Sequence, residues 1–245
     1  MGDCQRDAFA QRLAPPGRVR QAFRAVAREA YVPGAPPERV CADTPLPLGP
    51  PGINNGQPSL HAACISALDP QPGERALHVG AGTGYYTAIL AELVAEVDAY
   101  EVEPELARQA RANLAGYPRV RVRQRSGAVG PLPRADLIYV NCGATAPLDV
   151  WLEALRPGGR LLFPLTGSAG AGAMLLVGAG AGSTLPARWV APVVFIDCVG
   201  ARQKAEAQAL DRAFARGGRE RVRLLGRGLP AAGEAWVAGR GWWLG

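Results

Sequence analysis

The segment Leu77–Gly84, with the sequence Leu-His-Val-Gly-Ala-Gly-Thr-Gly, constrains the fold of this chain more than any other part. It follows a short apolar run and precedes a helical one, which predicts a glycine-rich turn between a strand and a helix. Gly80, Gly82 and Gly84 allow a tight turn and a close approach to a ligand, while the helix offers its first N–H groups. Tyr85 stands where a dinucleotide fingerprint has its last glycine. The G-x-G-x-G spacing therefore predicts a cofactor turn of another kind.

An acidic residue follows about twenty residues later, at the end of the next apolar run. This residue is Glu101, in the sequence Ala99-Tyr-Glu-Val-Glu-Pro104. An acid at the end of the second strand of such a unit can accept hydrogen bonds from both hydroxyls of a nucleoside ribose. The turn and the acid together predict a site for a nucleoside-containing cofactor.

Apolar runs alternate with helical patterns from Arg75 onward, which predicts an α/β fold with a mostly parallel, doubly wound sheet. We expect an amphipathic helix over residues 18–30 and another helix after Pro58. The later expected helices are 104–114, 148–155 and 204–216, and the expected strands are 75–79, 97–101, 120–124, 136–141, 160–164, 174–177 and 189–199. The last two strands predict an antiparallel hairpin at the edge of the sheet. Three of the five tryptophans stand in the last ten residues, where they either cover the core or form a lid or dimer contact.

Composition excludes several classes of protein. The chain of 245 residues has a net charge of +6, carried almost entirely by arginine, and its five cysteines form no C-x-x-C pair. We therefore expect reduced thiols and no metal site. The arginines at positions 119, 121, 123 and 125 alternate with valines or glutamine, which indicates the exposed face of a strand and not a nucleic-acid site. No apolar run is long enough for a membrane span, so we expect a cytoplasmic protein.

Several motifs together resemble the protein-L-isoaspartate O-methyltransferase family of class I S-adenosylmethionine-dependent enzymes. They are Arg28–Pro33, Pro45–Gly49, the Gln57-Pro58 turn before a helix, the glycine turn, and Leu155–Leu161 with the later Val199-Gly200. The resemblance spans about four fifths of the chain. It implies a Rossmann-like methyltransferase fold, S-adenosyl-L-methionine as cofactor, and cofactor-binding roles for Gly56, Gly80, Ala81, Gly82, Thr83, Gly84, Glu101, Val102, Ser126 and Gly127.

The sequence departs from that family where polar side chains matter most. The family's active-site serine falls on Gly56, the acid before the glycine turn falls on His78, and a later aspartate falls on Ser126. We expect Asn54, Asn55 and His78 to take the catalytic roles, with His78 orienting a carboxylate or acting as a base. Because Gly56 has no hydroxyl, we expect methylation of ordinary isoaspartyl peptides to be weak or absent.

The resemblance divides the chain into three parts. Residues 1–60 are expected to form a helical and loop cap over the site, residues 61–200 the cofactor-binding domain, and residues 201–245 a C-terminal helix and tryptophan-rich tail. The function implied is methylation of a carboxyl group on a peptide or protein. A small-molecule O- or N-methyltransferase and a catalytically silent binding domain stay open as alternatives, as does the oligomeric state.

Overall fold

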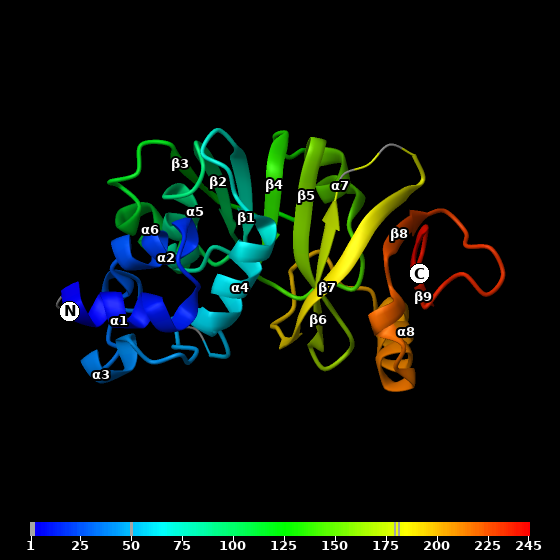
Figure 1. The fold of residues 1–245 in the computed structure, drawn as a ribbon, viewed down its shortest axis with the longest axis horizontal. Helices are drawn as coiled ribbons and strands as arrows, with labels where there is room; N and C mark the ends of the chain where they lie inside the picture. The colour runs from blue at the N-terminus through cyan, green and yellow to red at the C-terminus, as the bar shows by residue number, and fades with distance from the viewer. Residues whose placement is uncertain (1–2, 50, 179, 181) are drawn as a thin grey trace. The chain divides into compact units, whose positions relative to one another are not determined.

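The computed structural model describes residues 3–49, 51–178, 180 and 182–245, and these fall into two compact units, 1–125 and 126–245 (Figure 1). The boundary lies within the segment expected to be one cofactor-binding domain. The three-part division of the sequence stays a prediction.

The first unit consists of a helical N-terminal part and a three-stranded parallel sheet. The helices are α1 (Asp3–Leu13), α2 (Arg18–Ala25), η1 (Arg28–Tyr31), α3 (Pro37–Val40), α4 (Pro58–Leu68), α5 (Tyr85–Ala91) and α6 (Pro104–Asn113). The strands are β1 (Arg75–Val79), β2 (Glu96–Glu101) and β3 (Val120–Gln124), with β2 in the middle. Helices α4 and α6 both have proline in their first turn. Proline lacks a backbone N–H, and this costs no hydrogen bond there because the first N–H groups of a helix have no acceptor within the helix.

The expected helix over residues 18–30 is wrong in its second half. Helix α2 ends at Ala25 because Val26 is extended, with φ −89° and ψ 116°, and a separate 3-10 turn, η1, begins at Arg28. The break turns the Arg28 side chain into the interior, where it is fully buried. Helix α1, which has almost no amphipathic pattern, was not anticipated from the sequence.

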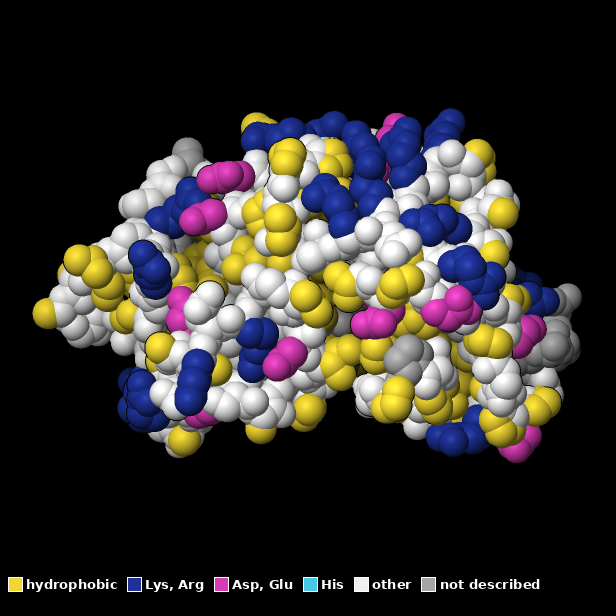
Figure 2. Space-filling view, turned by 180° about the vertical axis from the view of Figure 1, so that it is seen from behind, with side chains coloured by type: hydrophobic (Ala, Val, Ile, Leu, Met, Phe, Trp, Pro, Cys, Tyr) yellow, Lys and Arg dark blue, Asp and Glu magenta, His cyan; other side chains and the backbone are white. Residues whose placement is uncertain are grey.

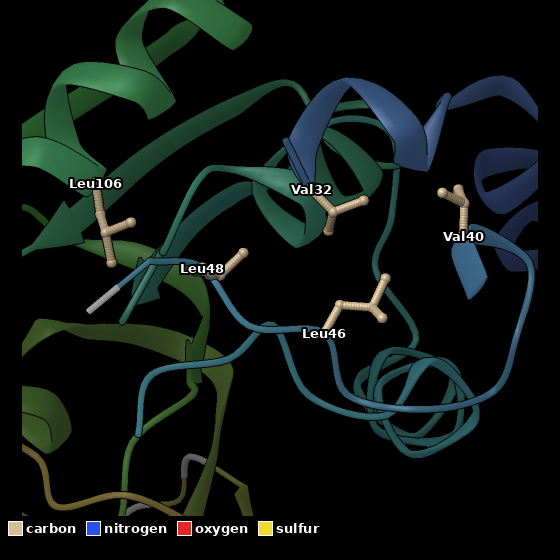
Figure 3. Packing of buried hydrophobic residues seen from close by; sticks show 5 residues of the cluster. All are labelled: Val32, Val40, Leu46, Leu48 and Leu106. Atoms are coloured by element: carbon tan, nitrogen blue, oxygen red, sulfur yellow. The ribbon is translucent and has the colours of Figure 1, made fainter. Parts of the chain in front are cut away.

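An apolar cluster joins the N-terminal segments of this unit to α6. Its five buried members, labelled in Figure 3, are Val32, Val40, Leu46, Leu48 and Leu106. Residues 46–48 pair in antiparallel fashion with residues 53–55, and we call this pair the hairpin: Leu48 N–H donates to Ile53 O at 3.1 Å and Asn55 N–H donates to Leu46 O at 3.0 Å. The cluster therefore fixes this hairpin against the rest of the unit.

Charged side chains cover one face of the three-stranded sheet. Asp98, fully buried on β2, accepts hydrogen bonds from Arg75 at 2.5 Å and Arg123 at 2.9 Å, while Arg121 pairs with Glu96 at 3.1 Å. Figure 2 shows acidic side chains beside the basic ones on the face of the molecule that it presents. Arg121 and Arg123 of β3 are exposed, as their alternation predicts, and both form ion pairs on the strand face.

The second unit continues with one parallel pair followed by antiparallel strands. It contains β4 (Ala135–Val140), β5 (Leu155–Thr166), β6 (Ala171–Gly178), β7 (Thr184–Val194), β8 (Leu224–Arg227), β9 (Val237–Ala238) and β10 (Trp242–Leu244), and the helices α7 (Asp149–Ala154), α8 (Lys204–Arg216) and η2 (Arg219–Arg221). β4 and β5 are parallel, and the pairs from β5–β6 to β10–β9 are antiparallel. The predicted change from parallel to antiparallel strands is confirmed.

The antiparallel part is larger than the expected edge hairpin. The expected strand over residues 189–199 begins earlier, at Thr184, because Thr184–Pro186 pair with Leu224–Gly226 of β8, and it ends at Val194. Trp242 and Trp243 are 5% and 4% exposed, so the terminal strand packs its tryptophans inside the unit. Their burial agrees with the packing interpretation of the tail.

Candidate functional site

The glycine turn of the first unit has the geometry that a cofactor turn needs. Gly80, Gly82 and Gly84 all have positive φ angles, of 79°, 55° and 97°. A Cβ atom at Gly82 would lie 2.9 Å from Leu48 Cδ1, and one at Gly84 would lie 2.8 Å from Leu114 Cδ1. Glycine is required here by both the backbone angle and the close packing.

The turn is tied to the end of β2 by Glu101. One carboxylate oxygen accepts a hydrogen bond from Gly82 N–H at 2.6 Å, and the other accepts from Val102 N–H at 2.8 Å and Glu103 N–H at 3.0 Å. The side chain is 7% exposed, and burial raises the pKa of Glu101 although these N–H donors favour its charged form. With two lone-pair sites on each oxygen, the oxygen bonded to Gly82 N–H keeps one that can accept a ribose hydroxyl. The carboxylate and the glycine turn therefore fit a nucleoside cofactor.

Gly80, Ala81 and Thr83, three other predicted cofactor residues, lie in this turn, whereas Gly56 lies in the Asn54–Gly56 turn and its cofactor contact stays a prediction. Thr83 is buried and donates its hydroxyl to Tyr31 O at 2.5 Å, while Thr83 O accepts from Asn113 Nδ2 at 2.9 Å. The N–H groups of Gly80 and Ala81 both donate to Tyr100 O. Thr83 thus anchors the turn to η1 and α6 through its own side chain and backbone.

Ser126 and Gly127 belong to the second unit, and their contacts lie within it. The Ser126 hydroxyl donates to Val199 O at 2.8 Å and accepts from Ala128 N–H at 3.1 Å. Gly127 O accepts from the indole of Trp151 at 2.7 Å. These bonds hold the backbone of the segment in place, and its cofactor contact stays a prediction.

Asn54 and Asn55 have different surroundings although they are neighbours in the chain. Asn54 is exposed, and its side-chain oxygen accepts from Gly56 N–H at 2.8 Å, which closes a local turn. Asn55 is buried, and its oxygen accepts from Leu46 N–H at 2.9 Å and from the Arg28 guanidinium at 3.2 Å. Asn55 therefore holds the hairpin, and Asn54 is the asparagine that faces solvent.

Arg28 is a functional candidate that sequence reasoning missed. Its guanidinium donates to three backbone oxygens, Val40 O, Ala42 O and Thr44 O, at 2.8–3.0 Å, and also reaches Asn55. Burial lowers the pKa of Arg28 from its usual value, while nearby groups including Asp43 oppose that shift. Arg28 belongs to the motif Arg28–Pro33, but the motif does not reveal its role because its hydrogen-bond partners lie 12–27 residues away in the sequence. A buried arginine thus supports the loop that carries Asn54–Gly56.

His78 lies in the interior of the first unit and not at an open surface. Its side chain is fully buried, and Nδ1 is 2.8 Å from the hydroxyl of Thr87 on α5. Burial lowers the pKa of His78 to about 3, so the ring is neutral near pH 7. If His78 orients a carboxylate, it would do so as a neutral ring, because a buried imidazolium lacks solvation. The geometry favours a packing contact, and a catalytic role stays a prediction.

His61 lies on α4 next to the Asn54–Gly56 turn. The ring is 2% exposed and stacks on Tyr86, with centroids 3.7 Å apart and planes 10° from parallel. Burial, together with His78 and Arg28, lowers the pKa of His61 to about 3. Asp43 accepts hydrogen bonds from Ser59 N–H and Gln57 Nε2, which fixes the start of the helix. The imidazole is therefore a rigid, neutral group beside the turn.

Within the described parts of the chain, no helix combines the length and apolar character needed to cross a membrane. Over the same residues, no group of three or more His, Cys, Asp or Glu side chains could hold a metal ion.

Comparison with known proteins identifies a family for most of the chain. A family model described as Protein-L-isoaspartate(D-aspartate) O-methyltransferase (PCMT) matches residues 7–203. The protein-L-isoaspartate O-methyltransferase of Methanopyrus kandleri is 41% identical over 156 residues, which cover 60% of this chain and 69% of that protein. The one from Myxococcus xanthus is 37% identical over 171 residues, which cover 67% of this chain and 80% of that protein.

Solved structures support the fold. A structure described as a protein-L-isoaspartate O-methyltransferase superposes with a TM-score of 0.73 at 22% identity, covering 87% of this chain and 70% of that one. A second, described as a putative enzyme of this kind from Plasmodium falciparum in complex with S-adenosyl-L-homocysteine, has a TM-score of 0.69 at 18% identity and covers 81% of this chain and 98% of that one. Both likenesses establish the methyltransferase fold.

Proposed function

Because the chain belongs to the protein-L-isoaspartate(D-aspartate) O-methyltransferase family, we propose that its acceptor is a carboxyl group of a protein or peptide, with the isoaspartyl carboxyl the first candidate. Membership of this family identifies the chain as an S-adenosylmethionine-dependent methyltransferase. It therefore favours an enzyme over a catalytically silent binding domain.

The observation that supports this proposal most strongly is the bond between Glu101 and the glycine turn. The Glu101 carboxylate is held by backbone N–H groups at the end of β2, beside glycines with positive φ angles. Gly80, Gly82 and Gly84 would allow close approach of the cofactor, and Glu101 would accept a ribose hydroxyl. Ser126 and Gly127 are proposed to contact the adenine on the basis of the resemblance alone.

Methyl transfer to a carboxylate requires the protein mainly to position the two reacting groups. When bound, S-adenosylmethionine supplies a methyl group already activated by the sulfonium, and its transfer to a carboxylate oxygen gives a methyl ester and S-adenosylhomocysteine. A carboxylate is ionised above a pKa of about 4, so this acceptor requires no general base. Holding the reacting groups in line and in contact can contribute roughly 7–11 kcal/mol. The residues of the site therefore need to bind and orient the acceptor.

Asn54 is the residue of the turn that we propose to contact the acceptor. Its amide nitrogen is a neutral donor on an exposed side chain, while its oxygen is already bonded to Gly56 N–H. Gly56 adds no side-chain hydroxyl. We therefore still predict slow turnover on ordinary isoaspartyl peptides, below about 1 per second. Asn55 is proposed to act indirectly, through the hairpin that it holds.

The test compares two synthetic peptides that differ only in one linkage, L-isoaspartyl against L-aspartyl. Incubation with radiolabelled S-adenosylmethionine should label only the isoaspartyl peptide, and mild base should release the label as methanol, because the product is an ester. A base-stable product, or no label in either peptide despite measurable S-adenosylhomocysteine binding, contradicts the proposed acceptor.

A small molecule with a hydroxyl or amine is the alternative acceptor. Such a group must lose a proton during transfer, which requires a general base typically worth 10²–10⁴-fold. The chain has only two histidines, and both are buried and neutral with pKa values lowered to about 3. A histidine with so low a pKa is a weak base, so the carboxyl acceptor is favoured.

A further inference from the structure

The position of Gly56 is closed to any larger residue by the His61 ring. Gly56 has φ +70°, and a Cβ atom built there would lie 2.1 Å from His61 Nε2, 2.9 Å from Cδ2 and 3.2 Å from Cε1. Real Cβ atoms do not tolerate such contacts, because packed interiors leave no room for overlap. The edge of the imidazole thus occupies the volume that a side chain at residue 56 would take.

The ring cannot easily move away from this volume. It is held by the stack on Tyr86, with centroids 3.7 Å apart, and is almost completely buried. The helix that carries it is fixed at its start by Asp43, which accepts from Ser59 N–H at 2.7 Å and Gln57 Nε2 at 2.9 Å. His61 is therefore a rigid wall and not the flexible end of a long side chain.

The other sides of the Asn54–Gly56 turn are held as well. Asn54 bonds to Gly56 N–H, and Asn55 is bonded to Leu46 and Arg28. With these contacts in place, the side of the turn at Gly56 is shaped by the His61 ring. A change in the ring would alter the turn there, while the glycine turn and Glu101 keep their own bonds.

We propose that His61 is a positioning residue that replaces a side chain at position 56: its ring shapes the Asn54–Gly56 turn and thereby decides how the acceptor carboxyl fits. This inference rests on the proposed function, which assigns the turn to the acceptor. The ring is uncharged near neutral pH, so it contributes shape and polarity without an ion pair to the carboxylate. The effect should appear in acceptor binding and acceptor choice, and not in cofactor binding.

The experiment uses the full chain with an L-isoaspartyl peptide and the matching D-aspartyl peptide. His61→Ala removes the ring, and His61→Phe keeps a ring that can stack on Tyr86. For His61→Ala we expect the KM for the L-isoaspartyl peptide to rise about tenfold or more and the preference between the two peptides to change about fivefold, with S-adenosylhomocysteine affinity unchanged within about twofold. His61→Phe should stay within about threefold of the wild type. If His61→Ala does not fold, His61→Leu gives the same comparison.

A second comparison tests the contact between the two positions directly. Gly56→Ala should lower kcat/KM for the acceptor more than about tenfold in the wild-type chain, and the loss should be at least about threefold smaller in the His61→Ala background, where only the strain of alanine at φ +70° remains. Equal losses in both backgrounds overturn the inference, as does an unchanged peptide preference in His61→Ala. Failure of the wild type to methylate either peptide while it binds S-adenosylhomocysteine overturns the proposed function, and the inference with it.

Discussion

Lowering the pH from about 7.5 to about 5.5 should destabilise the first unit through its two histidines. His61 and His78 are the only histidines in the chain, both are buried, and burial lowers the pKa of each to about 3 from a usual 6.5. Below pH 6.5 the unfolded chain binds protons that the folded chain does not. Stability therefore falls as the pH drops through this range and continues to fall until the folded value near 3 is reached.

The size of the effect follows from these values. At pH 5.5 each histidine should lower the free energy of unfolding by about 1.4 kcal/mol, because its unfolded form is about ten parts protonated to one part neutral. At pH 7.5 the loss is below about 0.1 kcal/mol, so the pair should cost about 2.7 kcal/mol over the interval. Glu101 acts in the opposite direction, since its pKa is raised and its contribution to stability is lost as the pH rises. The lowered pKa of Asp43 matters only at more acidic pH.

Urea unfolding at the two pH values, followed by far-UV circular dichroism, measures this difference. All five tryptophans lie in the second unit, so tryptophan fluorescence follows that unit separately. The variant His61→Phe should reduce the pH effect to about half, near 1.4 kcal/mol. A free energy of unfolding that changes by less than about 0.5 kcal/mol, or a variant with the full wild-type dependence, refutes the assignment of buried neutral histidines.

Four substitutions test other parts of the structure. Glu101→Ala should weaken S-adenosylhomocysteine binding by about 1–3 kcal/mol in calorimetry, and unchanged affinity would remove Glu101 from the cofactor site. Arg28→Met should destabilise the chain by about 1–3 kcal/mol for each carbonyl left buried without a donor, so urea stability equal to the wild type would contradict its supporting role. Trp243→Ala should cost about 3–5 kcal/mol in unfolding, whereas intact stability with lost turnover would indicate a lid. His78→Asn should keep the methylation rate within about tenfold, and a loss above about a hundredfold would indicate a general base.

The elements around the cofactor turn were predictable from the sequence because their signals are local. The strand over residues 75–79 and the helix over 204–216 begin and end where apolar runs, glycine and proline place them. Gly80, Gly82 and Gly84 have the positive φ angles that a tight turn needs, and Glu101 lies at the end of β2 beside them. The strand, the helix and the glycine turn are decided by residues within a few positions of one another, and Glu101 was predictable because its place at the end of the second strand follows from the order of the elements.

Features that depend on distant partners were not predictable. The break after Ala25 goes together with the burial of Arg28, whose bonding partners lie in residues 40–55. The early start of β7 follows from pairing with β8, about forty residues later. Alternation along β1 divides its side chains between two faces of the sheet, but it does not say which face a helix covers. The contact of His78 with Thr87 on α5 therefore could not be predicted. Such choices are made by tertiary packing.

The cofactor turn and the proposed acceptor turn share supports within the first unit. Leu48 packs against Gly82, and it belongs to the hairpin whose other strand ends at Asn55. Thr83, in the glycine turn, donates to Tyr31 O, and Tyr31 is the last residue of η1, the turn that carries Arg28. Arg28 in turn holds Asn55. Methyl transfer is sensitive to small errors in the distance between cofactor and acceptor. Residues that support both turns fix the distance between them, which a strong contact to only one turn would not do.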